Sequence, residues 1–186
     1  MRNALNPLIR LLSLTALLLV PVAARAQANV EQAFCNVVKA AATVYKSAED
    51  QGANELQLSK LRSSRRDALK KAVKNGVVKD WLGVIQELHT NGDGDATLMV
   101  ALPPCGEGVH LMTWTVGFAD ADDHTIIKQS SPLYAVLMKL RPGSIIKLSG
   151  KFLPSDQDAF KEASVTESGS MREPEFLLLF SLIAKP

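Results

Sequence analysis

The chain has 186 residues, of which 47% are hydrophobic and 22% are charged, and its formal net charge is +2. This length is enough for one domain with a buried core, or for one domain with a small annex. The 11 glycines and 9 prolines are ordinary numbers, so collagen-like and low-complexity chains are excluded. With only two cysteines, the chain cannot form a disulfide-dense miniature scaffold or a four-thiolate zinc site.

Residues 1–26 have the three-part pattern of a cleavable secretory signal peptide. Early arginines precede an apolar run over residues 11–20, and Ala24 and Ala26 are the small residues that a signal peptidase requires. The expected cut lies between Ala26 and Gln27. The apolar run is shorter than the about 20 residues that span a membrane, and an uncleaved tether is the alternative. We therefore expect export to a bacterial periplasm, with no integral membrane span in the mature protein.

Residues 27–76 have the periodicity of amphipathic helices. Apolar side chains recur at spacings of three and four, which places on one face Phe34, Val37, Val38, Ala41, Val44, Tyr45 and Ala48. Asn29 is the expected N-cap of this helix, and Gly52 is its expected end. A second helix is predicted to begin near Asn54 and to stop before Gly76, although one long helix kinked near Gly52 fits the pattern almost as well.

Charge is distributed unevenly along the mature chain. Residues 60–79 carry eight basic side chains and one acidic side chain, whereas residues 80–186 carry eight basic and fourteen acidic ones. Four of the basic residues would share one helix face that could meet anionic groups: Arg62, Arg65, Arg66 and Lys70. The alternative is a solvated face that partly neutralises the acidic remainder of the chain.

From Val77 onward the hydrophobic period is two, which indicates β-strands. Five strands are predicted, over residues 77–89, 96–102, 109–118, 144–153 and 175–184. Residues 91–95 are expected to be a turn, because the segment lacks the acidic twelfth residue of a calcium loop. A short helix is predicted over residues 132–140 with Ser131 as its N-cap, and a further short strand over residues 125–128 fits the pattern.

This order, five strands with one helix between the third and the fourth, resembles the OB-fold superfamily over residues 77–186. Gly83 inside the long first strand agrees with this, because that strand bends sharply to join both sides of the barrel. The predicted fold class is therefore α+β, a helical hairpin followed by a five-stranded OB-like barrel. The resemblance implies binding of oligonucleotides, oligosaccharides or proteins along the second and third strands.

The predicted ligand site lies on the polar side of those two strands. Alternation in the third strand predicts that Met112, Trp114, Val116 and Phe118 face the core, so the threonines between them should face solvent. The site is predicted to include Thr97, Thr113, Thr115, Asp120, Asp122, Asp123 and His124. Its acidic loop has the residue types to hold a divalent cation, but a solvated loop without metal is the expectation.

The sequence contains no catalytic, cofactor or metal motif. It lacks a Gly-x-Ser-x-Gly elbow and the glycine-rich loops that hold phosphates or dinucleotides. The three histidines, His89, His110 and His124, do not have metal-ligand spacing. Nucleic acid is a poor partner for the acidic strand region, and aromatic residues make up only 5% of the chain. We therefore expect a non-enzyme that uses no cofactor.

Cys35 and Cys105 are predicted to form a disulfide. An oxidising compartment favours one bridge over the alternative of two buried free thiols. The bridge would close a loop of about 70 residues and clamp the helical segment onto the barrel.

Together these features predict an exported, non-catalytic binding module for a protein, a peptide or a glycan of the cell envelope. One alternative is a hydrolase of envelope material, which would show a pocket with converging polar groups and shifted pKa values. Another is an assembly or inhibitory subunit that docks through its helices, which would show an exposed apolar stripe on them.

Overall fold

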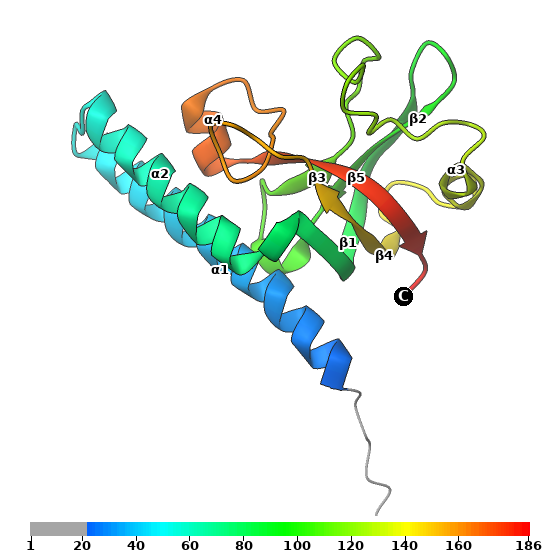
Figure 1. Ribbon diagram of the computed structural model, residues 1–186, viewed down its shortest axis with the longest axis horizontal. Helices are drawn as coiled ribbons and strands as arrows, with labels where there is room; N and C mark the ends of the chain where they lie inside the picture. The colour runs from blue at the N-terminus through cyan, green and yellow to red at the C-terminus, as the bar shows by residue number, and fades with distance from the viewer. Residues whose placement is uncertain (1–21) are drawn as a thin grey trace, which may run out of the picture.

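The computed structural model describes residues 22–186, with side-chain positions from Val30 onward. Its N-terminal part is a pair of helices, α1 (Val22–Asp50) and α2 (Glu55–Ala72), which lie side by side against a β-barrel (Figure 1). None of the described helices is both long and apolar enough to cross a membrane. The predicted signal peptide, residues 1–26, lies largely outside the described residues, so its cleavage stays a prediction.

Helix α1 begins earlier than the sequence predicted. Asn29 was expected to cap it, but the helix already runs from Val22, so Asn29 lies inside it. The physical reason is the composition of this stretch, because the residues before Asn29 are mainly alanine, arginine and glutamine, which favour helix.

The two helices are joined by a short turn, which confirms a hairpin rather than one kinked helix. Gly52 follows α1 with a φ of 77°, a conformation that glycine adopts without steric cost. Asn54 caps α2 as predicted: its side chain accepts a hydrogen bond from the backbone N–H of Gln57, whose side chain accepts one from Asn54 in return. A 3₁₀ turn over Lys74–Gly76 then leads into the barrel.

The barrel contains β1 (Val77–Thr90), β2 (Ala96–Ala101), β3 (His110–Met112), β4 (Ile145–Phe152) and β5 (Glu175–Ala184). The strands close in the order β1-β2-β3-β5-β4, with β3 parallel to β5 and the other neighbours antiparallel. Strand β1 pairs with β4 along its first half and with β2 along its second half. The α+β prediction of a helix pair and a five-stranded barrel is thereby confirmed.

The long strand β1 serves both sides of the barrel because it bends. Its register shifts between Val78 and Trp81, and again between Ile85 and Glu87. A Cβ atom at Gly83 would lie only 2.3 Å from a methyl carbon of Val100 in β2, so no other residue fits there without movement.

Two short helices complete the fold. Helix α3 (Pro132–Leu137) lies between β3 and β4 and is capped by Ser131, as predicted, although it ends before residue 140. Helix α4 (Glu167–Arg172) precedes β5 and was not predicted.

The third strand is much shorter than predicted, and the assignment of its faces was wrong. Thr113 is fully buried, whereas Phe118 is 87% exposed and Val116 is 43% exposed. The ladder ends because side-chain hydroxyls replace its backbone bonds: the hydroxyl of Thr113 accepts from the N–H of Leu98, and that of Thr125 accepts from the N–H of residue 114. Of the strand expected over residues 125–128, the structure forms one isolated bridge.

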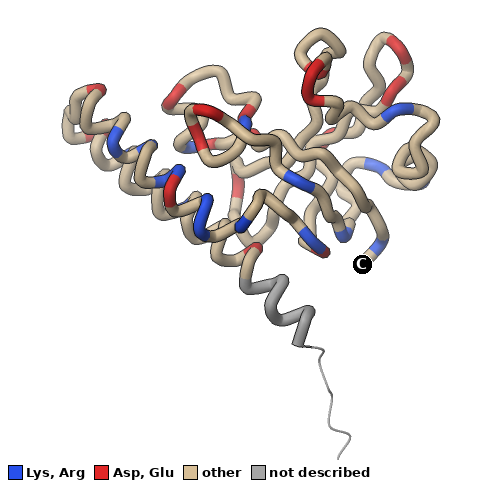
Figure 2. The backbone as a smooth tube through the Cα atoms, in the orientation of Figure 1, with Lys and Arg blue, Asp and Glu red and all other residues tan. Residues whose placement is uncertain are grey.

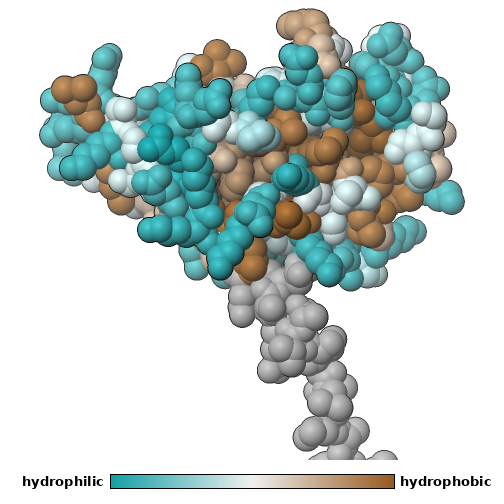
Figure 3. All heavy atoms as spheres, viewed as in Figure 1, coloured by the Kyte–Doolittle hydropathy of each residue, from teal (hydrophilic) through white to brown (hydrophobic). Residues whose placement is uncertain are grey.

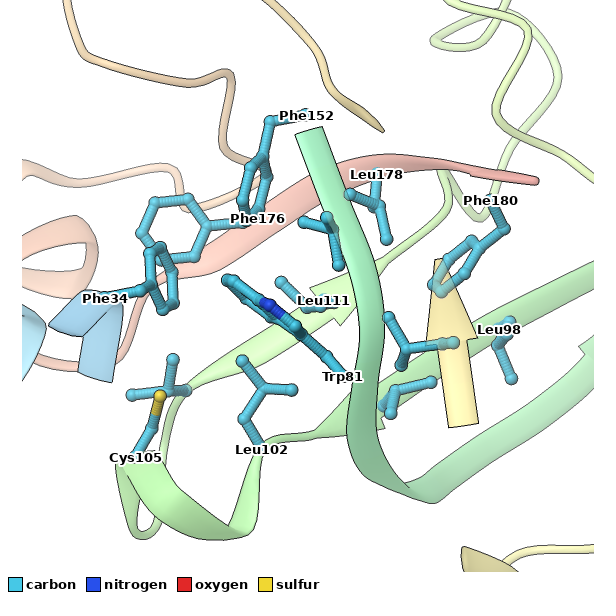
Figure 4. Close-up of a cluster of buried hydrophobic side chains, with 14 of the residues drawn as sticks. Phe34, Trp81, Leu98, Leu102, Cys105, Leu111, Phe152, Phe176, Leu178 and Phe180 are labelled. Atoms are coloured by element: carbon cyan, nitrogen blue, oxygen red, sulfur yellow. The ribbon is translucent and has the colours of Figure 1, made fainter. Parts of the chain in front are cut away.

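One core is shared by the barrel and the helix pair. Phe34 of α1 enters it, and its ring centre lies 5.2 Å from those of Trp81 in β1 and Phe176 in β5. Phe152 of β4 stacks 5.5 Å from Phe34 (Figure 4). The ring of Phe160 stacks on Phe152 in turn, with the ring centres 4.3 Å apart. Because α1 supplies a central aromatic side chain, the helix pair is an integral part of the folded unit rather than an appendage.

Beside this aromatic cluster, Cys35 and Cys105 form the predicted disulfide, with their Cα atoms 4.4 Å apart. Both cysteines are buried. Cys105 ends a 3₁₀ turn, Pro103–Cys105, between β2 and β3. The bridge therefore ties α1 directly to the barrel.

Glu31 of α1 lies against the part of β1 that has no β2 partner. Pairing with β2 begins at Val84, and the carboxylate of Glu31 accepts a hydrogen bond of 3.4 Å from the backbone N–H of Leu82. The other carboxylate oxygen of Glu31 is buried without a hydrogen-bond partner among the described residues. Burial raises the pKa of Glu31 from 4.5 to about 7, and the bond from Leu82 opposes this rise only partly.

The raised pKa of Glu31 predicts a pH-dependent stability. The folded state holds this proton more tightly than the unfolded state, so stability should fall as pH rises from about 4.5 to about 7 and stay level above. We expect Glu31→Gln to stabilise the protein by about 1–2 kcal/mol at about pH 8, allowing for solvent screening, and to add nothing at about pH 4. Thermal unfolding measured between about pH 4 and about pH 8 gives this difference in stability, and Glu107→Gln, at an exposed position, is the control. Parallel pH curves for Glu31→Gln and the unchanged protein would contradict the assignment.

Candidate functional site

The basic residues of α2 meet carboxylates of the connection between β4 and β5. The Nε of Arg62 lies 2.9 Å from Oδ1 of Asp158, and its Nη1 lies 3.4 Å from Oε2 of Glu167. The hydrogen bonds to Asp158 are the main reason that the pKa of Arg62 is raised above its usual value. Arg62 is therefore held against the barrel as a permanent cation.

Arg65 lies deeper between α2 and the barrel than Arg62 does, and its side chain is completely buried. Its Nη2 donates to Oε1 of Glu162 at 2.5 Å and to the hydroxyl of Ser170 at 3.0 Å. Its guanidinium carbon also lies 5.9 Å from the centre of the Phe176 ring, within range of a cation–π contact. Burial raises the pKa of Glu162, and the positive charge of Arg65 opposes this rise.

The predicted anion-binding face is therefore not assembled as an open surface. Arg66 donates to Asp67 and, at 3.3 Å, to the carbonyl of Gln157, and it is partly exposed. Lys70 is exposed. The arrangement agrees with the alternative interpretation for Arg62 and Arg65, in which basic side chains neutralise acidic ones of the barrel.

The acidic loop after β3 is organised by two of its carboxylates. Asp120 is buried and accepts hydrogen bonds from the backbone N–H groups of Thr125 and Ile126. Asp123 accepts from the indole N–H of Trp114 at 2.7 Å and from Lys161 at 2.6 Å. Burial acts to raise the pKa of Asp123, but its bonds to Lys161 and Trp114 outweigh burial and lower the pKa.

The residues predicted to form a ligand surface over strands 2 and 3 therefore do not lie together on one exposed surface. Thr97 and Thr113 are buried, whereas Thr115, Asp122 and His124 are exposed on the loop. Among residues 22–186, no group of three histidine, cysteine or carboxylate side chains is placed to hold a metal ion. The segment at residues 91–95 is a turn, as predicted, between β1 and β2.

A more continuous candidate lies along the outer seam between α1 and α2. Two neighbouring cavities, of about 270 and about 630 Å³, share the lining residues Val44, Leu61 and Ser64 and form what we call the helix-pair groove. The smaller cavity is otherwise lined by Val37, Ala40, Ala41, Arg65 and Ala68, and the larger by Ala48, Gln51, Gly52, Ala53, Gln57 and Lys60.

The groove exists because the apolar residues of α1 form two stripes rather than one. Phe34, Val38 and Tyr45 are buried, whereas Val44 is 51% exposed and Val37 is half-buried. The spacing of these residues predicts one apolar face, and the width of that face was the signal for a second, outward stripe. Small alanine and serine side chains on both helices leave the seam hollow.

No protein-family model, no curated protein and no solved structure matches the chain. The strand order and the parallel β3–β5 pair are consistent with an OB-like fold. This likeness concerns architecture alone, and a fold does not fix a function. The function is therefore argued from the surfaces of the molecule.

Proposed function

We propose that this protein is an exported, non-catalytic binding module that takes an α-helical segment of a partner protein in its helix-pair groove. The observation that carries the proposal is the apolar, partly exposed seam between two helices whose other side is fixed to the barrel. An exposed apolar stripe marks a docking surface, because leaving it in water costs free energy that a partner recovers.

The dimensions and lining of the groove favour a helix as the ligand. From Val37 to Ala48 the groove follows about three turns of α1, or about 16 Å, at a rise of about 1.5 Å per residue. Small side chains allow a third helix to approach both backbones closely and to place its own side chains between them. A glycan fits the smaller cavity less well, because its hydroxyl groups need hydrogen-bond partners and that cavity is lined mainly by valine, leucine and alanine side chains.

The charged side chains of the groove indicate which residues the partner helix should carry. Two ionised side chains line the groove, and Arg65 is already bonded to Glu162. Lys60, at the end nearer the hairpin turn, is exposed. We expect the partner helix to be amphipathic, with alanine- or leucine-sized residues on one side and a carboxylate opposite Lys60.

The proposed compartment is the periplasm or another oxidising space. The disulfide between Cys35 and Cys105 supports this, since such bridges persist where thiols are not kept reduced. The signal-like pattern of residues 1–26 supports it independently.

Peptide display tests this function. We expect random peptides selected on the exported protein to share apolar residues at helical spacing and at least one carboxylate. Val44→Glu places a charge in the groove at a half-exposed position and should weaken their binding at least about tenfold, which is about 1.4 kcal/mol. Val165→Glu is the matched control, because Val165 is 98% exposed and lies outside the groove.

Binding is measured by fluorescence anisotropy, and folding of each variant by thermal unfolding. The proposal is wrong if the library yields no binder, or if its binders tolerate Val44→Glu as well as they tolerate Val165→Glu.

A further inference from the structure

A second unpartnered surface lies on the barrel, on the outward side of strands β1, β4 and β5. We call it the outer sheet face. It exposes five large aliphatic side chains to between 41% and 59% of their full area: Val77, Leu82, Ile145, Leu179 and Leu182. Figure 3 shows hydrophobic atoms gathered over β4 and β5 on the side turned to the viewer, with hydrophilic atoms between them.

The strand register arranges lysines among these aliphatic side chains. In β4, Lys151 is the cross-strand partner of both Val77 in β1 and Leu179 in β5. Lys147 has the equivalent position further along β4, between Leu82 and an alanine of β5. Each lysine of the middle strand is therefore flanked by apolar side chains of the outer strands, on which its own aliphatic stem can lie.

The charge of the outer sheet face is opposite to that of the barrel as a whole. Lys79 lies at its start, and Lys70 lines a cavity together with Lys151 at its end nearer α2. Asp80, at a bulge in β1, is an exposed carboxylate of this region, and the carboxylate of Glu31 is buried beside Leu82. The other acidic side chains of the barrel lie mainly on loops, and Figure 2 shows several of them on the two loops at the top of the view.

We propose that the outer sheet face binds the surface of an anionic lipid bilayer. Charge complementarity selects an anionic partner, because lysines are interleaved with the apolar side chains over three strands. The aliphatic side chains would enter the headgroup region of the bilayer, and the lysines around them would bind the lipid phosphates.

The shape of the face favours a bilayer over an acidic peptide. Within this face, β1, β4 and β5 are hydrogen-bonded to one another, so a peptide lying on it could not add a strand to the sheet. Two cavities lie at the ends of the face, one lined by Lys151 and Phe160 and the other by Arg141 and Ile145, and neither is lined by Leu82, Leu179 or Leu182. A convex outer wall of this kind can rest on a membrane surface, whereas a peptide needs a groove.

Vesicle flotation tests the inference with two lipid compositions: phosphatidylglycerol and phosphatidylcholine in equal parts, and phosphatidylcholine alone. We expect the exported protein to float with the anionic vesicles only, and to be released as salt screens its lysines. Lys147→Glu combined with Lys151→Glu should reduce the bound fraction at least about tenfold. Leu179→Ser combined with Leu182→Ser should reduce it several-fold while leaving the net charge unchanged.

Three controls keep the result interpretable. Lys39→Glu with Lys46→Glu makes the same change of charge on α1 and should leave flotation intact. Lys147→Gln with Lys151→Gln is a milder pair that should also reduce binding, and thermal unfolding reports whether each variant folds. Val44→Glu should float normally, so loss of groove binding and loss of membrane binding are distinguishable.

Absence of binding to anionic vesicles would overturn the inference. So would equal losses in the α1 control and the β4 pair. Binding to poly-glutamate with no binding to vesicles would also overturn it, in favour of an acidic protein partner.

Discussion

Replacing Arg65 with methionine is expected to lower the free energy of unfolding by about 3–5 kcal/mol. Arg65 is the buried cation that faces Glu162 across 2.5 Å, so its loss leaves a buried carboxylate without a partner. Burial already raises the pKa of Glu162. The loss of stability in Arg65→Met should therefore become smaller as pH falls, because a protonated Glu162 no longer needs a cation.

Urea unfolding followed by tryptophan fluorescence measures this effect. Arg66→Met is the control, because Arg66 is partly exposed, and it should change stability by no more than about 0.5 kcal/mol. Adding Glu162→Met to Arg65→Met should recover most of the loss, since it removes the uncompensated charge. A loss below about 1 kcal/mol for Arg65→Met alone would show that the pair does not hold the helices to the barrel.

Removing the disulfide should have the next largest effect. Cys35→Ala combined with Cys105→Ala is expected to cost about 4 kcal/mol, because the bridge closes a loop of 70 residues and so restricts the unfolded chain. Reducing agent added to the unchanged protein should give the same value, which separates the role of the bridge from any effect of the substitutions. Equal unfolding free energies for the oxidised protein and the double variant would contradict a stabilising clamp.

The elements with strong local signals were predictable from the sequence. The hairpin turn was marked by Gly52 and Asn54, since both residues act through their own backbone or immediate neighbours. The fifth strand, Glu175–Ala184, matches its prediction at both ends. The turn depends on contacts within a few residues of the chain, and the strand is marked by its own run of apolar residues, so a sequence pattern records both directly.

The end of β3 was not predictable from alternation. The apolar residues Trp114, Val116 and Phe118 continue the strand pattern, yet hydroxyl groups of Thr113 and Thr125 take over the hydrogen bonds of the ladder. Whether a threonine side chain replaces a backbone partner depends on a segment more than ten residues away. Pattern alone could not decide this competition.

The sequence also did not predict that Arg62 and Arg65 of the basic helix face the barrel. The carboxylates that engage Arg62 and Arg65 come from residues 158–167, about 100 residues later and in a largely irregular segment. Helix α4 in that segment had a usable signal that was missed, a threonine N-cap at Thr166 followed by Glu167 in the first turn.

The central claim is that the helix-pair groove is where this protein takes its partner. Photo-crosslinking in cells, with benzoylphenylalanine in place of Val44 or, separately, of Val165, tests it most directly. We predict one discrete protein adduct from position 44, lost when Ala41→Asp is added, and none from position 165. Equal adducts from both positions, or an adduct at position 44 that Ala41→Asp leaves unchanged, would contradict the claim.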